Sequence, residues 1–568
     1  MSEIRKTDVL VIGGGGAGMR AAIEAAAQGC GVIVANKGPV GRSGTTPMAM
    51  EAFQAVCSPG DSEELHFRDT VVGGRHLGDE NLISTLVRDA ARRAKDLESY
   101  GVQFKKKADG SYDPMHHPGQ TLPRTLFIQG GGFGMLAGLI REARRNPGIR
   151  ILDEVLVSRL ILDREGKASG AVFLDLRDGV WKAIQSKAVV LATGGYEELF
   201  AWSDASNTAC GDGVFLAYEA GAQLVDLEML QFFPTVVIHP PSVQRTLFQY
   251  ELITNPEVLG GRLLNGKMEP FFEGFLLRDT IVRTIWREIR EGRGTPHGGV
   301  FIDLVHSSKS RDDLTRALEK WQPNQFHYLK DMGVDLREVL VEVAPHAHYA
   351  IGGIKIDEEA RTTVAGLFAA GEVAGNLHGA NRVSGNALAE TQVFGALAGA
   401  SAAAVAKGRG FDPLPEISPP AEWAERFLRG GEGRNREDIR PREVRERLKR
   451  IMWEECGGER DAQGLKRGIQ KISQLERVVL PGMSIPEISG SNSYGAYPQE
   501  VQDALEVKMM VPLACLVLSS ALFREETRGH HLRTDYPDSA KEPKHTFLAE
   551  GKEPWQGEVK KEKQGWEG

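Results

Sequence analysis

A run of glycines near the start of the chain has the spacing of a phosphate-binding turn. Gly13, Gly15 and Gly18 satisfy the pattern G-x-G-x-x-G. In such a turn one glycine closes the bend, one lets the backbone approach a diphosphate, and one lets the helix pack on the preceding strand. The helix that follows would point its positive end at the phosphates. The pattern therefore predicts a dinucleotide site.

Three side chains farther along the chain could bind a carboxylate. Arg278 begins a predicted helix, His348 precedes a tyrosine and a glycine turn, and Arg382 lies among glycines and asparagines. A planar guanidinium binds a carboxylate through two parallel hydrogen bonds, and a histidine can donate another. Each residue also has an ordinary structural interpretation: an arginine at a helix start, a histidine satisfied in the core, and an arginine in an exposed turn.

Two strand ends carry polar groups that suit a nucleotide. The second predicted strand ends at Asn36 and Lys37, where an acidic residue usually binds the ribose. An asparagine can accept the same hydrogen bond without a charge. Glu372 follows another buried run that ends in a glycine, and it could bind a ribose or ribityl hydroxyl or be a surface carboxylate. Strands distant in the sequence can bring such groups to one cofactor.

The elements around the glycine turn predict a doubly wound α/β sheet. Asp8–Ile12 is an apolar run of the parallel-strand type, a helix follows over Met19–Gln28, and Val32–Ala35 is the next strand. Alternating residues in Ile151–Asp163 and Ala171–Ala183 predict a small antiparallel layer. Further helices are predicted over 61–101, 130–145, 278–291, 311–332 and 387–407.

Changes in composition divide the chain into five predicted segments. Residues 1–235 form the first part of a nucleotide-binding domain, and its glycine motifs resume in 345–411. The intervening residues 236–344 are predicted to form an inserted second domain. A proline-rich linker opens a charge-laced, helical domain over 412–535. The polar tail, 536–568, could wrap around a partner or be loosely ordered.

Composition argues against several classes of protein. The 568 residues carry a net charge of -8 without a basic block, which disfavours nucleic-acid binding. The 5 cysteines form no C-x-x-C pair, and the adjacent histidine pairs at 116–117 and 530–531 would point apart, so we predict no metal site. The longest apolar runs fall short of the roughly 20 residues of a membrane span, and no secretion-signal pattern opens the chain. We expect a cytoplasmic protein that contacts a membrane only through partners.

Eight motifs follow one another in the order of a known family. They are VIGGGGAGMRAA, ACGDG, QFFPT, RDT, HYAIGGI, GLFAAGE, HGANRVSGNALAE and ETRGHHLRTDYP. They span nearly the whole chain, which resembles the succinate dehydrogenase/fumarate reductase flavoprotein family. That family includes L-aspartate oxidase and the adenylylsulfate reductase flavoprotein. The resemblance implies a Rossmann-like FAD-binding domain split by an α+β capping domain and followed by a C-terminal helical domain.

The resemblance also implies a role for individual side chains. His348 and Arg382 would bind a substrate carboxylate while hydride passes between flavin N5 and the adjacent C=C bond, and Arg278 would deliver the proton. Donors at the carboxylate stabilise the charge that develops there. The pKa of arginine normally stays above about 12, so only the resemblance supports an acid role for Arg278. The implied FAD contacts are Gly13, Gly14, Gly15, Gly16, Ala17, Gly18, Asn36, Lys37, Ser43, Asp212, Glu372, Ala387 and Leu388.

The chain departs from the family at the position of flavin attachment. Membrane-bound members attach FAD to the histidine of an Arg-Ser-His-Thr motif, whereas this sequence reads Arg42-Ser43-Gly44-Thr45. We therefore expect noncovalent FAD. Because covalent attachment accompanies a raised flavin potential and succinate oxidation in the family, we also expect this protein to work better as a reductase. A flavin potential above that of the fumarate/succinate couple would contradict this hypothesis.

The chain also departs from the family at the far end of the substrate. The histidine of the family motif Gln-Phe-His-Pro-Thr is Phe233 here, which removes a donor. An alignment with a one-residue gap retains the substrate threonine as Thr254. The same alignment changes the relay carboxylate to Asn255, leaves out the relay arginine, and offers Glu257 as a substitute. An apolar ring would suit a substrate with a less polar far end.

The source of electrons lies outside this sequence, which contains no cluster or haem motif and no fused redox module. We therefore expect an iron–sulfur partner and a carboxylate substrate. Two other functions stay open: a flavoenzyme like adenylylsulfate reductase or L-aspartate oxidase, and an FAD-bearing electron-transfer subunit whose substrate site has decayed. Retention of Arg278, His348 and Arg382 favours reduction of a C=C bond.

Overall fold

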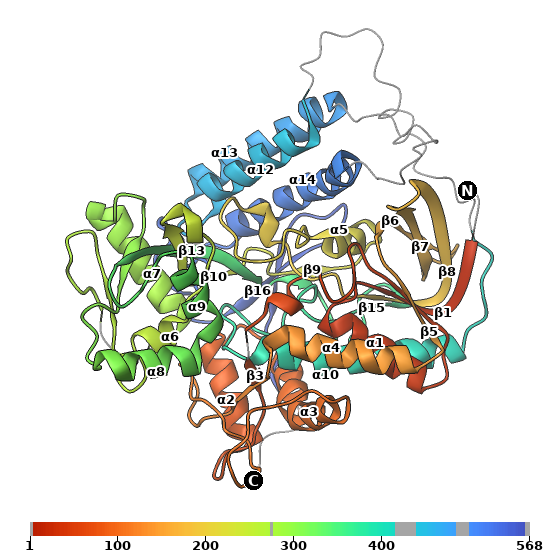
Figure 1. The fold of residues 1–568 in the computed structure, drawn as a ribbon. Coiled ribbons are helices and arrows are strands. Elements are labelled where there is room, and N and C mark those ends of the chain that lie inside the picture. The colour runs from red at the N-terminus through yellow and green to blue at the C-terminus, as the bar shows by residue number, and fades with distance from the viewer. Residues whose placement is uncertain (1–3, 51, 273–275, 415–438, 484–498, 563–568) are drawn as a thin grey trace.

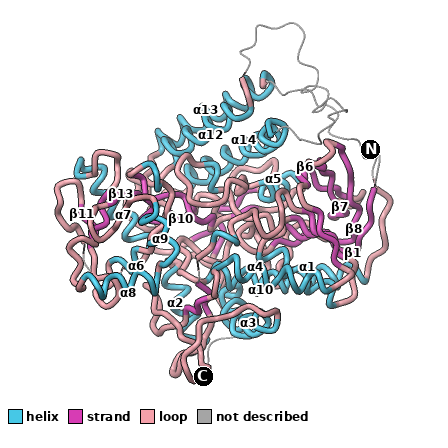
Figure 2. The backbone as a smooth tube through the Cα atoms, viewed as in Figure 1, coloured by secondary structure: helices cyan, strands magenta, loops and turns pink. Residues whose placement is uncertain are grey.

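The computed structural model describes residues 4–50, 52–272, 276–414, 439–483 and 499–562. Figure 1 shows three regions: a sheet with covering helices on the right, a smaller α/β region on the left, and a group of helices along the top. Figure 2 shows the strands of the large sheet gathered at one side, away from helices α12 to α14. These helices are α12 (Pro441–Cys456), α13 (Ala462–Gln474) and α14 (Gln499–Phe523).

A seven-stranded sheet carries the glycine turn. Strand β1 (Ile4–Ile12) pairs in parallel with β2 (Val32–Ala35) and with β8 (Val180–Leu191). The inner residues of these strands are apolar and buried, as in parallel sheets covered on both faces. The sheet is completed by β5 (Ile149–Leu152) and β15 (Leu367–Ala369), both parallel, and by β7 (Ala168–Asp175) and β6 (Val155–Leu162), which are antiparallel. The predicted α/β class is confirmed, although a turn divides the predicted strand 171–183 between β7 and β8.

Two helices pack unusually closely beneath the sheet. Helix α1 (Gly16–Ala27) follows the glycine turn, and α10 (Asn386–Lys407) lies against it. A Cβ at Gly399 would lie 2.3 Å from the Ala21 carbonyl oxygen, and one at Gly395 would lie 2.7 Å from that of Ala17. The two glycines therefore permit an approach that would exclude any side chain. The neighbouring elements are α2 (Glu63–Gly73), α3 (Glu80–Ser99), α4 (Gly131–Arg145), β3 (Ala52–Gln54) and β4 (Thr125–Phe127).

The second region has a hydrophobic core of its own, built from residues between Val237 and Val343. Its sheet joins β10 (Leu230–His239) to β13 (Val341–Ala350) and then to β12 (Val300–Asp303) and β11 (Arg262–Leu264). This core falls within the segment 236–344 predicted as an insertion, and the five-part division remains a prediction. The helices are α6 (Tyr250–Ile253), α7 (Arg278–Glu288), α8 (Arg311–Trp321) and α9 (Pro323–Asp331). The last two replace the single helix predicted over 311–332, because Pro323 begins a new helix.

The tail, 536–568, contains two strands, whereas the sequence predicted a segment that wraps around a partner or is loosely ordered. Strand β16 (Lys544–Leu548) pairs with β17 (Trp555–Glu558) and with β9 (Leu224–Val225), which pairs in turn with β14 (Gly353–Ile354). The buried Asp226 side chain accepts a hydrogen bond from the Thr546 backbone and contacts His545 at 2.5 Å. These buried contacts hold residues 544–558 against the body of the protein. The segment KHTFL shows no alternation of apolar and polar residues, so its pattern gave no strand signal.

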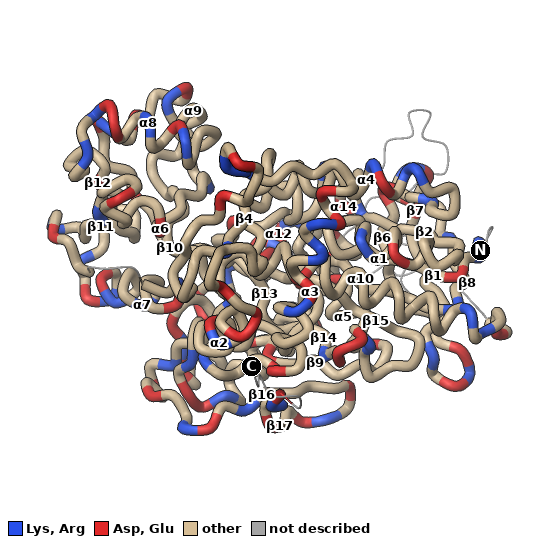
Figure 3. The backbone as a smooth tube through the Cα atoms, turned by 90° about the horizontal axis from the view of Figure 1, so that it is seen from below, with Lys and Arg blue, Asp and Glu red and all other residues tan. Residues whose placement is uncertain are grey.

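Two helices are long and apolar enough to cross a membrane, α10 and α14, but 67% of each apolar window is buried inside the protein. Helix α10 packs on α1 and β8, and α14 packs on α12, α13 and α5 (Asp212–Glu219). Figure 3 shows basic and acidic residues interspersed along the chain, in agreement with its small net charge. The predicted linker lies mostly outside the described residues.

Candidate active site

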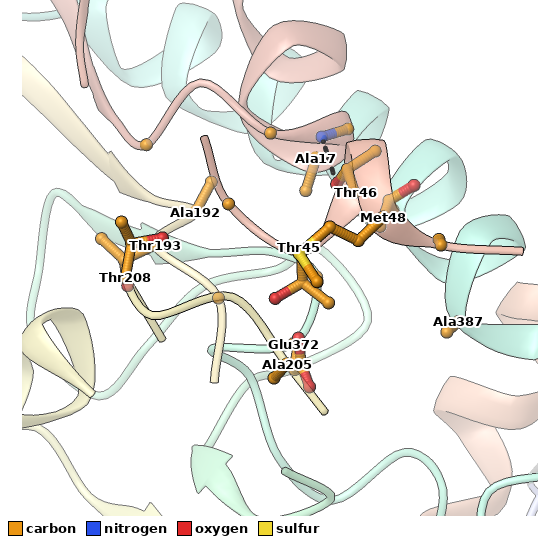
Figure 4. A pocket seen from close by; sticks show the side chains of 18 of the residues that line it. Ala17, Thr45, Thr46, Met48, Ala192, Thr193, Ala205, Thr208, Glu372 and Ala387 are labelled. Atoms are coloured by element: carbon orange, nitrogen blue, oxygen red, sulfur yellow. Dashed lines mark hydrogen bonds between the residues drawn. The ribbon is translucent and has the colours of Figure 1, made fainter. Parts of the chain in front are cut away.

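A large cavity opens where the glycine turn, the second region and the loops after β8 and β15 meet. It holds about 1660 Å³ of empty space. Figure 4 shows side chains of its lining, including Thr193 after β8 and Glu372 after β15. The lining includes nearly every residue selected from the sequence: Gly13, Gly14, Gly15, Gly16, Ala17, Asn36, Lys37, Ser43, Asp212, Phe233, Arg278, His348, Glu372, Arg382, Ala387 and Leu388.

The glycine turn presents backbone atoms that no side chain covers to one end of the cavity. Helix α1 begins there without an acidic residue in its first turn and without a side-chain cap on Gly15. The Asn36 side chain accepts a hydrogen bond from the Gly14 backbone at 2.7 Å, so it shapes the turn from the next strand. Gly18 lies outside the lining because it packs α1 against Gly13, where a Cβ would meet the carbonyl oxygen at 1.9 Å. The helix start can therefore receive a diphosphate.

Lys37 takes part in a buried ionic cluster at the same end of the cavity. Its Nζ lies 2.7 Å from Asp212 and 2.8 Å from Glu506 of helix α14. Burial alone would lower its pKa, but Asp212 and the other acidic groups outweigh this and raise it. Arg445 of α12 binds the same Glu506 at 2.8 Å. The cofactor end of the cavity is thereby tied to the C-terminal helices.

Arg278 and Arg382 bring two guanidinium groups to the opposite end. Arg278 lies 3.1 Å from the buried Glu251 carboxylate. Arg382 lies 4.6 Å from the Tyr349 ring, and its buried Nε has no hydrogen-bond partner among the described residues. Burial and the positive charge of Arg278 lower the pKa of Arg382 to about 10. A buried cation of this kind is stabilised when an anion enters the cavity.

His348 faces the cavity beside these arginines, and Asp204 holds its ring. The Nδ1 atom lies 3.0 and 3.1 Å from the two Asp204 oxygens. Burial lowers the pKa of His348, whereas Asp204 opposes this effect. The contact fixes the ring so that Nε2 is the nitrogen left for a ligand, and protonation of the ring would turn Nε2 into a donor.

Phe233 lies in the middle of this group. Its ring is 4.7 Å from the Arg278 guanidinium and 5.0 Å from the His348 ring, and Tyr250 lies behind it. Leu247 and Gln249 also line the cavity nearby. One end of the site is therefore cationic, and the adjoining wall combines the apolar Phe233 and Leu247 with the amide of Gln249.

Thr254 is not among the lining residues. Its hydroxyl donates a hydrogen bond to the Tyr250 carbonyl at 3.0 Å, one turn back in α6. The Asn255 side chain accepts from the Glu257 backbone at 2.9 Å in the following turn. The carboxylate that contacts Arg278 belongs to Glu251, which the gapped alignment did not select. Only the fold could identify it, because 27 residues separate it from Arg278.

The residues present fit FAD. Thr193, Asp212 and Arg382 all line the cavity, and each has a buried polar side-chain atom without a partner among the described residues. Such orphaned atoms indicate groups that are completed by a ligand. Position 44 is a glycine with a φ angle of +83°, so it offers no side chain for covalent attachment of the flavin. Within the described residues no cluster of acidic, histidine or cysteine side chains could hold a metal ion.

The family model described as FAD binding domain matches residues 8–388, and the one described as Fumarate reductase flavoprotein C-term matches residues 445–563. Over 558 residues the chain is 37% identical to one of the subunits of fumarate reductase (CoM/CoB) from Methanothermobacter marburgensis, with coverage of 96% of this chain and 97% of that protein. The chain belongs to the fumarate reductase/succinate dehydrogenase flavoprotein family. It is an FAD-dependent oxidoreductase, as the sequence motifs predicted.

Other members of the flavoprotein family show how widely the fold is shared. A structure of E. coli quinol fumarate reductase superimposes with a TM-score of 0.87 at 28% identity, covering 99% of this chain and 98% of the other. L-aspartate oxidase of Streptomyces coelicolor is 30% identical over 545 residues, covering 94% of this chain and 89% of the relative. The chemistry of this flavoprotein must therefore be argued from its own cavity.

Proposed function

We propose that the protein reduces a C=C bond conjugated to a carboxylate. The observation that carries this proposal is the convergence of Arg278, His348 and Arg382 on one end of the FAD cavity, where the Arg382 Nε has no partner among the described residues. When bound, FAD supplies hydride from its flavin ring. Arg382 and His348 would bind the substrate carboxylate and stabilise the negative charge that develops on it. The same contacts hold the alkene in a fixed orientation.

Arg278 is the proposed proton donor to the substrate carbon. Its guanidinium contacts Glu251 at 3.1 Å, and the second Glu251 oxygen is buried without a partner among the described residues. Glu251 is therefore placed to return a proton to Arg278 after transfer. This assignment gives Glu251 the relay function for which the sequence had offered Glu257 as a substitute.

Phe233 refines the proposed substrate. The ring replaces a donor with an apolar surface beside the cationic groups, so the end of the substrate away from Arg382 has little to bind a second carboxylate. We therefore infer that 2-enoates with an uncharged far end are accepted along with or in preference to fumarate. Noncovalent FAD, an iron–sulfur partner and a cytoplasmic location belong to the same proposal. The subunit names of the relatives support a partner.

The test is anaerobic. The protein is purified with its flavin, reduced with dithionite, and mixed with fumarate or with crotonate while the absorbance of oxidised flavin is followed. Return of the oxidised spectrum with either acid supports the proposal, and the faster acid identifies the substrate class. If neither acid reoxidises fully bound flavin, the proposal is wrong. An Arg382→Ala variant that still passes electrons at the normal rate would instead support an electron-transfer role.

A further inference from the structure

Two carboxyl groups meet behind the FAD cavity, one of them buried and the other partly exposed to the cavity. Glu197, in the short helix Glu197–Leu199 after β8, is completely buried, and Glu372 lines the cavity after β15. Both accept a hydrogen bond from the Ala350 backbone N–H, at 2.6 Å and 3.1 Å. Because one N–H reaches an oxygen of each group, the two carboxyl groups lie side by side. A carboxyl–carboxyl hydrogen bond requires that one of the two groups carries a proton.

The surroundings provide little to balance two negative charges. Asp204 adds a further negative charge near Glu197, and Tyr196 and Tyr349 are neutral phenols. Arg382 is the cation that faces Glu372, but its effect on that group is smaller than the effects of burial and of Glu197. Burial raises the pKa of Glu197, and burial together with Glu197 raises that of Glu372 well above its usual range.

The neighbouring Glu198 differs from Glu197 because it has a cationic partner. It is also buried, but Lys449 of helix α12 lies 2.7 Å from its carboxylate. A lysine at this distance favours the ionised form. Glu197 has no cationic partner of this kind in the described chain, and its second oxygen is buried without an assigned donor.

We propose that Glu197 and Glu372 form a proton-sharing pair that holds one proton between the two carboxyl groups. The pair then carries one negative charge, and Glu372 keeps free lone pairs directed at the cavity for a hydroxyl group of the cofactor. Two adjacent carboxylates in low dielectric do not both ionise at neutral pH. Glu197 is thus a positioning residue for the FAD site, acting through Glu372.

The shared proton makes FAD binding depend on pH. Bound cofactor covers the part of Glu372 that faces the cavity and excludes water, so it binds best while the pair holds its proton. Above the upper pKa of the pair, the dissociation constant of FAD should rise by up to about tenfold per pH unit, because one proton must be taken up on binding. Glu197→Gln keeps a neutral donor and removes the proton, so its dissociation constant should stay flat over the same range.

Two measurements test the pair. The full-length protein is freed of flavin, and FAD binding is titrated by flavin fluorescence from acidic to alkaline pH in wild type, Glu197→Gln and the control Glu198→Gln. Infrared spectra of the holoprotein at neutral pH are then compared for the C=O band of a protonated carboxyl group. We expect this band in wild type and Glu198→Gln, its loss in Glu197→Gln, and a shifted band in Glu372→Gln, where the buried Glu197 acid remains beside an amide.

The infrared comparison keeps the proposal testable if Glu197→Gln folds poorly, because Glu372→Gln changes the partner of the remaining acid and should shift the same band. A wild-type spectrum without a band that responds to these substitutions would overturn the proposal. So would a pH dependence of FAD binding that is identical in wild type and Glu197→Gln. Neither result would bear on C=C reduction, which is tested separately by reoxidation of the flavin.

Discussion

Phe233 has the clearest consequence of any single side chain in the cavity. Its ring contacts Arg278 and His348, so it shapes the anion site without donating a hydrogen bond. Aromatic and guanidinium groups attract each other, and this contact helps to keep Arg278 in place when no substrate is bound. Substrate preference should therefore be sensitive to this position while FAD binding is not.

Replacement of Phe233 by histidine should shift the preference toward dicarboxylates. A hydrogen bond to a charged group contributes about 1.5–3 kcal/mol, so the KM for fumarate should fall by about tenfold or more, with little change for crotonate. Steady-state kinetics with both acids and a reduced dye measure the ratio. Phe233→Leu is the control because it keeps an apolar wall. An unchanged ratio in Phe233→His would show that this position does not face the far end of the substrate.

Arg382→Met should lose activity and gain stability. Removal of a transition-state donor costs about 10²–10³-fold in turnover. Loss of a buried cation that has no ion pair among the described residues, and whose pKa burial lowers to about 10, should raise the free energy of unfolding of the substrate-free protein by about 1 kcal/mol or more. Turnover and thermal unfolding, each with and without fumarate, measure the two effects. A destabilised variant would mean that Arg382 has an ionic partner before substrate binds.

Sequence reasoning at this scale succeeded where motifs are local. The glycine turn, Asn36, Glu372 and Arg382 all lie in short patterns, and all line the cavity. Residues such as Asp204 and Glu251 were missed because they act through partners 144 and 27 positions away. Thr254, selected by an alignment across a gap, lies outside the cavity lining, and its hydroxyl donates to the Tyr250 carbonyl.

Helices α1 and α10 determine the geometry of the cofactor site at the scale of elements. The close approach allowed by Gly395 and Gly399 fixes the start of α1, and the first residues of α10, Ala387 and Leu388, line the same cavity. A small displacement between the helices would therefore move two walls of the cavity together.

Gly399→Ala should reduce both stability and FAD retention. The new Cβ would lie 2.3 Å from the Ala21 carbonyl oxygen, so the helices must separate, at a cost of about 1–3 kcal/mol. Thermal unfolding and the flavin content after gel filtration measure the two effects. Gly410→Ala is the matched control, because an added Cβ there meets nothing within 4 Å. Equal behaviour of the two variants would show that the helix spacing does not govern the site.

Most elements could be predicted because their periodicity is strong. The strand 32–35 and the helix over 387–407 agree with the structure to within a residue. Errors arose where a local signal competed with packing: Pro323 divided one predicted helix, and the tail formed strands because Asp226 and β9 bind it. Polar composition alone does not reveal such long-range pairing.

The buried ionic cluster joins the cofactor domain to the C-terminal helices at the scale of the whole molecule. Glu506 contacts Lys37 at 2.8 Å and Arg445 at 2.8 Å. Burial works against its charge, but Lys37 and Arg445 lower its pKa. Since its folded pKa lies below the unfolded value, the stabilisation is present above the unfolded pKa and is lost as pH falls through the folded pKa.

Glu506→Gln should therefore weaken the attachment of the C-terminal helices. Removing one partner of a buried ion pair costs about 3–5 kcal/mol, because the cations remain buried with less compensation. Urea unfolding near neutral pH should show the loss, and the difference from wild type should shrink in acid. Glu500→Gln, which removes an exposed contact with Arg440, should change little. If the cluster does not stabilise the fold, both variants should have the same free energy of unfolding as wild type.

The same cluster affects the order in which parts of the protein can pack together during synthesis. The glycine turn emerges first, but its cavity also needs Glu372, Arg382 and Leu388, and Lys37 meets Glu506 only when the chain is almost finished. Domains usually fold in the order in which they are synthesised, at about 5–20 residues per second. Here the N-terminal strands must wait for partners several hundred residues later. Flavin can therefore be captured only after the chain has been made as far as Leu388, and the ionic cluster beside it is completed only when Glu506 follows.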